Sequence, residues 1–121
     1  MYSKIIIIGN LGRDPEMKFT PAGEPVTSFS VAVNDGFGEN KRVMWVRVSV
    51  WGKQAESCNT YLSKGSKVLV EGRLKSNSDG NPNVYQRKDG TWASSYEVVA
   101  ESVKFLSGKD EPAAPDIDVA F

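Results

Sequence analysis

The chain has 121 residues, 40% of them hydrophobic, and its 15 Lys and Arg balance 15 Asp and Glu to a formal net charge of zero. This length and composition predict one folded domain with a single core. No run of apolar residues approaches about 18, the minimum for a membrane span, and no signal-peptide pattern is visible, so we expect a cytoplasmic protein. The single cysteine, Cys58, cannot form an internal disulfide, and the lack of histidine argues against most zinc sites and His-based catalysis. We therefore expect no cofactor, no metal site and no enzymatic activity.

The neutral total is an average over two unlike parts of the chain. Residues 109–121 hold one lysine against four acidic residues, a net charge of −3, which leaves 14 basic against 11 acidic residues, or +3, in residues 1–108. The last segment has neither a helical nor a strand period, so we expect residues 108–121 to form a short disordered acidic tail after a folded domain at residues 1–107. A basic body suits a nucleic-acid partner, although a charge of +3 is also ordinary for a globular domain.

Apolar periodicity predicts strands over most of the domain. Five are expected, at residues 5–8, 26–34, 42–51, 67–74 and 96–105, with residues 17–19 as a short addition to the sheet. Turn-forming residues fill positions 10–15 and 20–25, and residues 35–41 form a Gly-rich loop. In the last strand the alternation slips near Val98 and Val99, which predicts a bulge there.

One segment, residues 53–64, has helical character. Its apolar residues recur on one helical face: Ala55, Cys58, Tyr61 and Leu62. Gly65 lies where a C-terminal cap is expected. The order of three strands, a helix and two strands is that of the OB-fold, a five-stranded Greek-key barrel. The sequence thus predicts an all-β domain with one helix between strands 3 and 4, at one end of the barrel.

The strand at residues 42–51 carries the chemistry. One of its two rows of side chains is aliphatic and must face the core: Met44, Val46, Val48 and Val50. The other row combines two indoles with a cation: Val43, Trp45, Arg47, Ser49 and Trp51. At about 3.3 Å per residue, the two tryptophans lie roughly 20 Å apart along the strand.

Exposed aromatic rings beside cations suit a surface that stacks nucleobases and follows phosphates. Further aromatic residues lie in or near loops: Phe37 in the Gly-rich loop at residues 35–41, and Tyr85 in a long loop at residues 76–91. Basic residues gather close to this second loop, at Arg73, Lys75, Arg87 and Lys88, and Lys53 follows Trp51 closely. An alternative is that the tryptophans pack at a subunit interface or under a loop.

Four motifs resemble the bacterial-type single-stranded DNA-binding proteins: IIGNLGRDPE at residues 7–16, WVRVSVWGKQAE at 45–56, YLSKGS at 61–66 and VEGRL at 70–74. The match spans residues 3–107. This resemblance implies an OB-fold subunit, usually in a homotetramer, that binds and protects single-stranded DNA without reading its sequence, in replication, recombination and repair. It also implies a location at the bacterial nucleoid, with a phage origin left open.

The resemblance implies roles for individual residues. The family's base-stacking aromatics correspond to Phe37, Trp45 and Trp51, and the one in the last hairpin to Tyr85, with Trp92 as an alternative. The basic positions that match its phosphate contacts are Arg47, Lys53, Lys64, Arg73 and Lys75, to which the cluster adds Arg87 and Lys88. The family's usual histidine after the first strand tryptophan is Val46 here, so this position does not support a tetramer.

The family also ends in an acidic, apolar tip that docks replication and repair proteins. The corresponding residues are Asp116, Ile117, Asp118, Val119, Ala120 and Phe121, where Ala120 replaces the usual proline. A basic pocket with an apolar slot could hold such a terminus; the alternative is an acidic end that only promotes solubility. Three rival functions remain. The protein could be an OB-fold protein that binds RNA or acts in the primosome, or an assembly module that uses the aromatic row as a protein interface. The third is a nuclease, but metal-dependent nucleases need clustered carboxylates, and the acidic residues of this domain are scattered.

Overall fold

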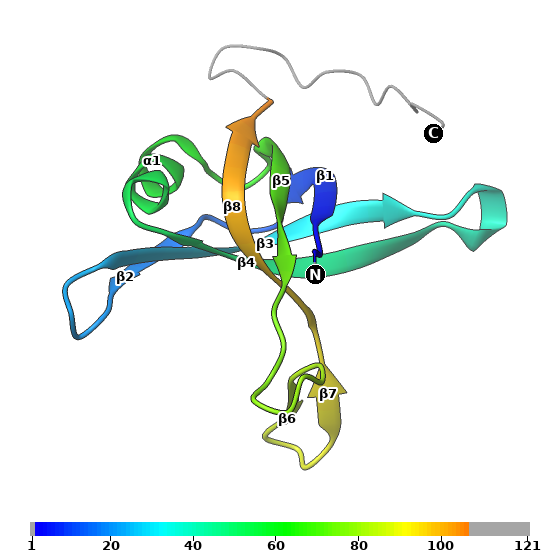
Figure 1. Ribbon diagram of the computed structural model, residues 1–121. Coiled ribbons are helices and arrows are strands. Elements are labelled where there is room, and N and C mark those ends of the chain that lie inside the picture. Colours follow the sequence, from blue (N-terminus) through cyan, green and yellow to red (C-terminus); the bar gives the residue numbers. More distant parts are fainter. Residues whose placement is uncertain (1, 107–121) are drawn as a thin grey trace.

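The computed structural model describes residues 2–106, which form a closed β-barrel with one α-helix (Figure 1). The strands are β1 (Ile5–Leu11), β2 (Glu16–Phe19), β3 (Pro25–Asp35), β4 (Arg42–Trp51), β5 (Lys67–Leu74), β6 (Val84–Gln86), β7 (Trp92–Ser94) and β8 (Tyr96–Phe105). The helices are the 3-10 turn η1 (Gly38–Asn40) and α1 (Lys53–Tyr61). The tail at residues 107–121 lies outside the described residues.

The barrel has five strands in the order β1-β5-β8-β4-β3, and β2 extends the sheet beyond β3. It closes where Asn10 and Leu11 of β1 pair with Ala32 and Val31 of β3. Since α1 follows β4 and precedes β5, it lies between the third and fourth barrel strands. The predicted OB-fold architecture is therefore confirmed.

The core is built from inward-facing aliphatic residues of all five barrel strands, among them Val31, Val48, Val68, Val70 and Val98. Helix α1 covers one end and buries Ala55 and Cys58 against it. The buried Thr27 hydroxyl of β3 donates a hydrogen bond to the Ala55 carbonyl (2.6 Å), which fixes the helix to the barrel. Burial raises the pKa of the Cys58 thiol to about 11, so Cys58 is an uncharged core residue at neutral pH.

Two elements differ by more than one residue in extent from the sequence prediction. Strand β1 runs through residues 10–11, which were expected to be loop, because their pairing with β3 closes the barrel. Helix α1 ends at Tyr61 instead of Lys64, and Gly65 is not its cap: Leu62 is, in an extended conformation. Hydrogen bonds formed by the following turn, from the Gly65 amide to the Leu11 carbonyl and from the Lys64 amide to the Asp14 carboxylate, draw the chain away from the helix axis.

The predicted bulge in β8 exists but lies at Glu101, two residues beyond the Val98–Val99 pair where it was expected. Glu71 pairs with Ser102 and Gly72 with Ala100, so Glu101 is the extra residue. The Gln54 side chain of α1 holds this site, because its amide nitrogen donates to the Glu101 carbonyl (3.3 Å) and its oxygen accepts from the Val103 amide (3.1 Å). Through these two hydrogen bonds, the bulge attaches α1 to β8.

The β3–β4 and β6–β7 hairpins both project from the barrel as arms (Figure 1). The β3–β4 arm ends in the turn around η1, and the β6–β7 arm leaves the opposite side of the sheet from α1. Strand β6 lies within the loop predicted at residues 76–91, and β7 follows it directly. The sequence did not predict either strand, because each has only three residues.

Barrel closure depends on a close approach between β1 and β3 at Gly9. A methyl group at this position would overlap the Ala32 carbonyl oxygen and lie 2.7 Å from Val31 Cγ1. We expect Gly9→Ala to lower the free energy of unfolding by about 3 kcal/mol in denaturant titrations, because a backbone oxygen cannot move aside cheaply. Thr60→Ser, at an exposed position of α1 away from this contact, should change it by less than about 0.5 kcal/mol. An unchanged stability for Gly9→Ala would contradict this closure geometry.

Candidate nucleic-acid interface

The outer face of β4 carries both strand tryptophans. Val46, Val48 and Val50 are buried to 1% exposure or less, whereas Trp45 and Trp51 remain 53% and 46% exposed. Arg47 lies between them on the exposed side. The predicted division of this strand into a core row and an exposed row is confirmed.

The neighbouring strand β3 provides a low floor beside this row. Its antiparallel register sets Ala32 opposite Trp45, Ser30 opposite Arg47, and Ser28 opposite Ser49. These short side chains lie beside Trp45 and Arg47, whereas Trp51 is opposite the larger Val26; both indoles remain about half exposed. The result is a shallow strip with a ring at each end and a guanidinium between them.

The Trp45 indole rests on the loop after β1. It lies so close to Gly12 that a methyl group there would come within 2.6 Å of its Cη2 atom. Gly12, Arg13, Ser30 and Trp45 line a hollow of about 310 Å³. The lack of a side chain at Gly12 therefore leaves room for the Trp45 indole. Arg13 adds a second guanidinium at this end of the strip.

A second hollow, of about 340 Å³, joins the strip to the β6–β7 arm. It is lined by Ser30, Trp45, Arg47, Asn83, Tyr85, Ser95 and Glu97. The Asn83 side-chain amide donates to the Glu97 carboxylate (2.6 Å) and so ties the base of the arm to β8. Two aromatic rings from distant parts of the chain, Trp45 and Tyr85, thus share one hollow with Arg47.

The register of the arm distinguishes Tyr85 from Trp92. Tyr85 pairs with Ala93, and Gln86 pairs with Trp92, so the two aromatic residues lie on opposite faces of the hairpin. Only Tyr85 lines the hollow beside Trp45. This geometry selects Tyr85 as the hairpin partner of the β4 strip and leaves Trp92 on the other face.

Comparison with known proteins agrees with this geometry. The model of the single-strand binding protein family matches residues 2–106. The chain belongs to this family. Single-strand binding proteins are a non-enzymatic DNA-binding family, which agrees with the interpretation of the sequence as a binding protein.

Curated relatives carry the same description. A single-stranded DNA-binding protein of Neisseria meningitidis serogroup A is 41% identical over 114 residues, which cover 90% of this chain and 62% of the relative. Those of Clostridium tetani and Oceanobacillus iheyensis are 43% and 33% identical, over 86% and 96% of this chain and 70% of each relative. The chain thus spans about 62% of the length of the Neisseria relative.

The other site residues predicted from the sequence are more widely spread. Phe37 is 75% exposed and directly precedes η1 at the tip of the β3–β4 arm. Lys53 begins α1, two residues after Trp51. The Lys64 amide donates to Asp14, next to Arg13, and the Lys75 amide donates to the Glu97 carbonyl at the Tyr85 hollow.

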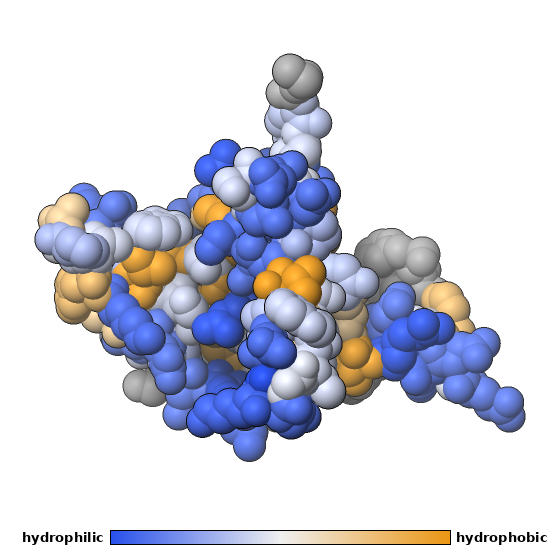
Figure 2. Space-filling view, turned by 90° about the horizontal axis from the view of Figure 1, so that it is seen from below, coloured by the Kyte–Doolittle hydropathy of each residue, from blue (hydrophilic) through white to orange (hydrophobic). Residues whose placement is uncertain are grey.

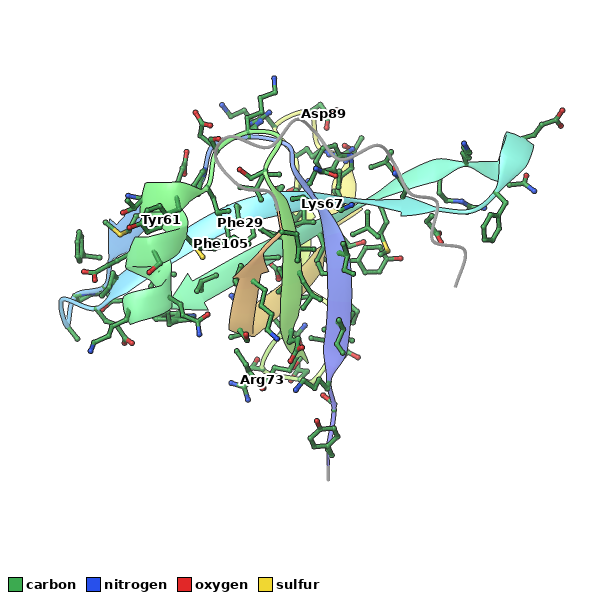
Figure 3. All side chains as sticks on the ribbon, turned by 90° about the horizontal axis from the view of Figure 1, so that it is seen from above. Phe29, Tyr61, Lys67, Arg73, Asp89 and Phe105 are labelled. Carbon is green, nitrogen blue, oxygen red and sulfur yellow. The ribbon has the colours of Figure 1, made fainter. Side chains whose placement is uncertain are left out.

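The basic cluster predicted around the last hairpin is divided in space. Arg73 lies at the end of β5, and Figure 3 shows it on the far side of the molecule from Asp89 in the hairpin turn. Arg87 and Lys88 belong to that turn, so they do not gather with Arg73. The phosphate-binding roles of all these residues stay predictions.

Sequence reasoning missed three residues of the strip. Gly12 and Arg13 were read only as loop, although both lie inside the motif at residues 7–16 that carries the family resemblance. Lys18 of β2 is aligned with Val26, which is itself paired with Trp51, so a lysine shares the row of the second indole. Nothing in the sequence signals Lys18, because its proximity depends on the register of two strand pairs.

Within residues 2–106, no group of His, Cys, Asp and Glu side chains is arranged to hold a metal ion. No helix in this part of the chain is long and apolar enough to cross a membrane.

The contact between Gly12 and Trp45 yields a spectroscopic prediction. Gly12→Ala should push the indole out of its position and change the near-ultraviolet circular dichroism and tryptophan emission, with little loss of stability, because Trp45 is half exposed. In a Trp45→Phe background the same substitution should leave the signals of the remaining tryptophans unchanged. If Gly12→Ala alters the spectra equally in both backgrounds, the signal does not come from Trp45 and the contact is wrong.

Proposed function

We propose that this protein binds single-stranded DNA along the β3–β4 strip without reading its base sequence. The observation that carries the proposal is the hollow in which Trp45, Arg47 and Tyr85 meet beside a floor of small residues. Exposed rings offer stacking surfaces that every base can use, and the guanidinium is suited to the phosphate that links two stacked bases. The curated relatives, which are named single-stranded DNA-binding proteins, support the same substrate.

The shape of the strip favours an unpaired strand over a duplex. Bases in a duplex are stacked on one another and paired, so their faces are closed to protein side chains. The floor beside the rings is built of serine and alanine side chains, Ser28, Ser30 and Ala32. Binding therefore depends on ring faces and backbone charge, which explains the lack of sequence preference.

A fluorescence titration tests this proposal. Tryptophan emission should be quenched by oligothymidylate and other single strands of different sequence, and duplex DNA of equal length should compete weakly. Single-stranded RNA is the control for the rival function, since a protein built for RNA would bind it more tightly than DNA of the same sequence. No quenching by any single strand would overturn the proposal.

Self-association is the second part of the proposal. Strand β1 exposes Ile6 and Ile8, which are 58% and 43% exposed, and among the residues that the structure describes, positions 5–9 of this strand pair only with β5. An apolar strand with a free edge is a surface that a second copy can cover. This surface lies on a different strand from the two tryptophans, so a dimer formed through β1 leaves the strips open, and a homotetramer would join two such dimers through a second contact.

The cellular role extends the same activity. A protein that holds DNA single-stranded protects it and opposes hairpins by mass action, which suits replication, recombination and repair in the bacterial cytoplasm. The acidic tip would recruit the proteins that act on that strand. This tip, with the rest of the tail, lies outside the described residues, and the proposal rests on its sequence alone.

Substitution of either strand tryptophan should weaken DNA binding without unfolding the protein. Each of Trp45→Ala and Trp51→Ala removes one stacking surface, a loss of about 1–3 kcal/mol in binding free energy, measured by titration with poly(dT). Tyr61→Ala is the matched control, because Tyr61 is an aromatic residue of α1 that is 70% exposed and lies outside the strip. Wild-type affinity in both tryptophan variants would contradict the stacking row.

Deletion of residues 116–121 separates DNA binding from partner recruitment. It removes two acidic residues and the terminal Phe121, so affinity for DNA should stay equal or rise slightly, while capture of replication and repair proteins on a DNA column is lost. Replacement of Asp116 and Asp118 by Asn, with the apolar residues kept, is the comparison that isolates charge. Full recruitment by the deleted protein would show that the tip is only a solubilising end.

A further inference from the structure

The β6–β7 hairpin has two faces, and the strip uses only one of them. Its register aligns Val84 with Ser94, Tyr85 with Ala93, and Gln86 with Trp92. Because side chains alternate along a strand, Tyr85 points to one face and Trp92 to the other, where it shares the surface with Val84. The first face borders the hollow of Trp45 and Arg47.

The second face presents an open aromatic ring. Trp92 is 68% exposed, the most of the three tryptophans in the sequence. The Gln86 side chain opposite it donates to the Gly90 carbonyl (3.1 Å), so its amide is engaged with the turn. A large exposed aromatic side chain of this kind is typical of a surface that binds a ligand or another molecule.

The turn that joins β6 to β7, at residues 87–91, is basic. Arg87 and Lys88 are both exposed there, and the one acidic residue, Asp89, accepts hydrogen bonds at the same oxygen from the Thr91 amide (2.9 Å) and hydroxyl (2.6 Å). These bonds lower the pKa of Asp89 and direct its charge toward Thr91. Asp89 stays ionised, so the turn presents two cations against one carboxylate, a net charge of +1.

We propose that Trp92 is a second base-stacking site, and that single-stranded DNA passes from Tyr85 around the basic turn to Trp92, so that both faces of the hairpin are used. The proposal rests on the proposed function, since it extends the path of the same strand. It places a phosphate of the DNA at Arg87 and Lys88 and a base on each side of them.

Charge and surface composition favour DNA over a second protein copy as the occupant. Two copies meeting at this face would bring like-charged turns together, whereas a DNA backbone is attracted to them. Seen from the side of the hairpin, the molecule is mostly polar, and its apolar residues form small separate patches (Figure 2). A stable protein interface needs a larger continuous apolar core.

A protein with Trp92 as its only tryptophan tests the proposal directly. Trp45→Phe with Trp51→Phe keeps rings in the strip and removes the other two indoles. Saturation of this variant with poly(dT) should quench its emission. Unchanged emission at saturation, with binding verified by fluorescence anisotropy of labelled DNA, would overturn the second site. Emission that changes with protein concentration in the absence of DNA would overturn it too, in favour of a second copy.

Affinity measurements with labelled DNA give an independent reading. Trp92→Leu should weaken binding to poly(dT) at least about fivefold, whereas Trp92→Phe, which keeps a ring, should stay within about twofold of wild type. A short oligothymidylate of about five nucleotides, which covers only the strip, should bind both variants equally well. Equal binding of poly(dT) to both variants would overturn this site but leave the proposed function intact; failure of the wild type to bind any single strand would overturn the proposed function itself.

Discussion

The antiparallel ladder between β3 and β4 is the constraint on which the rest of the structure depends. Its register joins ten residue pairs, from Val26 opposite Trp51 to Asp35 opposite Arg42. Each residue of β4 faces either the core or the strip, so a slip by one position would bury the indoles and expose Val46, Val48 and Val50. The core and the proposed binding surface are therefore built from opposite faces of one strand. The packing energy of Val46, Val48 and Val50 in the core also holds Trp45, Arg47 and Trp51 facing outward.

Closure of the barrel extends this constraint to the rest of the site. Strand β1 reaches β3 only because Gly9 permits a close approach, and the loop that follows brings Gly12 and Arg13 to Trp45. On the other side, the bond from Asn83 to Glu97 ties the β6–β7 arm to β8 and sets Tyr85 beside the same indole. The strip is assembled from three regions of the chain around one tryptophan.

Local patterns predicted the elements whose periodicity is long and unmixed. The ten-residue alternation of β4 identified both its extent and its two faces, and Val68 and Val70 of β5 lie in the core as their alternation predicts. The isoleucine run of β1 was a poorer guide, because Ile7 is buried whereas Ile6 and Ile8 are exposed. Nonlocal bonds decided what remained. Helix α1 stops at Tyr61 because the turn after it bonds to Asp14 and Leu11, and the bulge lies at Glu101, where Gln54 holds both of its ends.

The choice between Tyr85 and Trp92 could not be made from the sequence. A three-residue strand is too short for a pattern of alternating apolar residues, so the face on which each side chain lies follows only from the pairing of β6 with β7. Net charge misled for a related reason. A total of zero combines a basic domain with an acidic tail, and inside the domain the cations again separate, with Arg73 distant from the turn that holds Arg87 and Lys88. Which charges act together depends on the topology and not on their spacing in the chain.

The central claim is that single-stranded DNA lies along the outer face of β3 and β4. Nuclear magnetic resonance maps this directly, through amide and indole resonances of the isotopically labelled protein titrated with a short oligothymidylate. The account predicts that the indole N–H signals of Trp45 and Trp51 and the amides of Ser30, Arg47 and Tyr85 shift together. Shifts confined to β1, β5 and α1, with both indole signals unmoved, would contradict it.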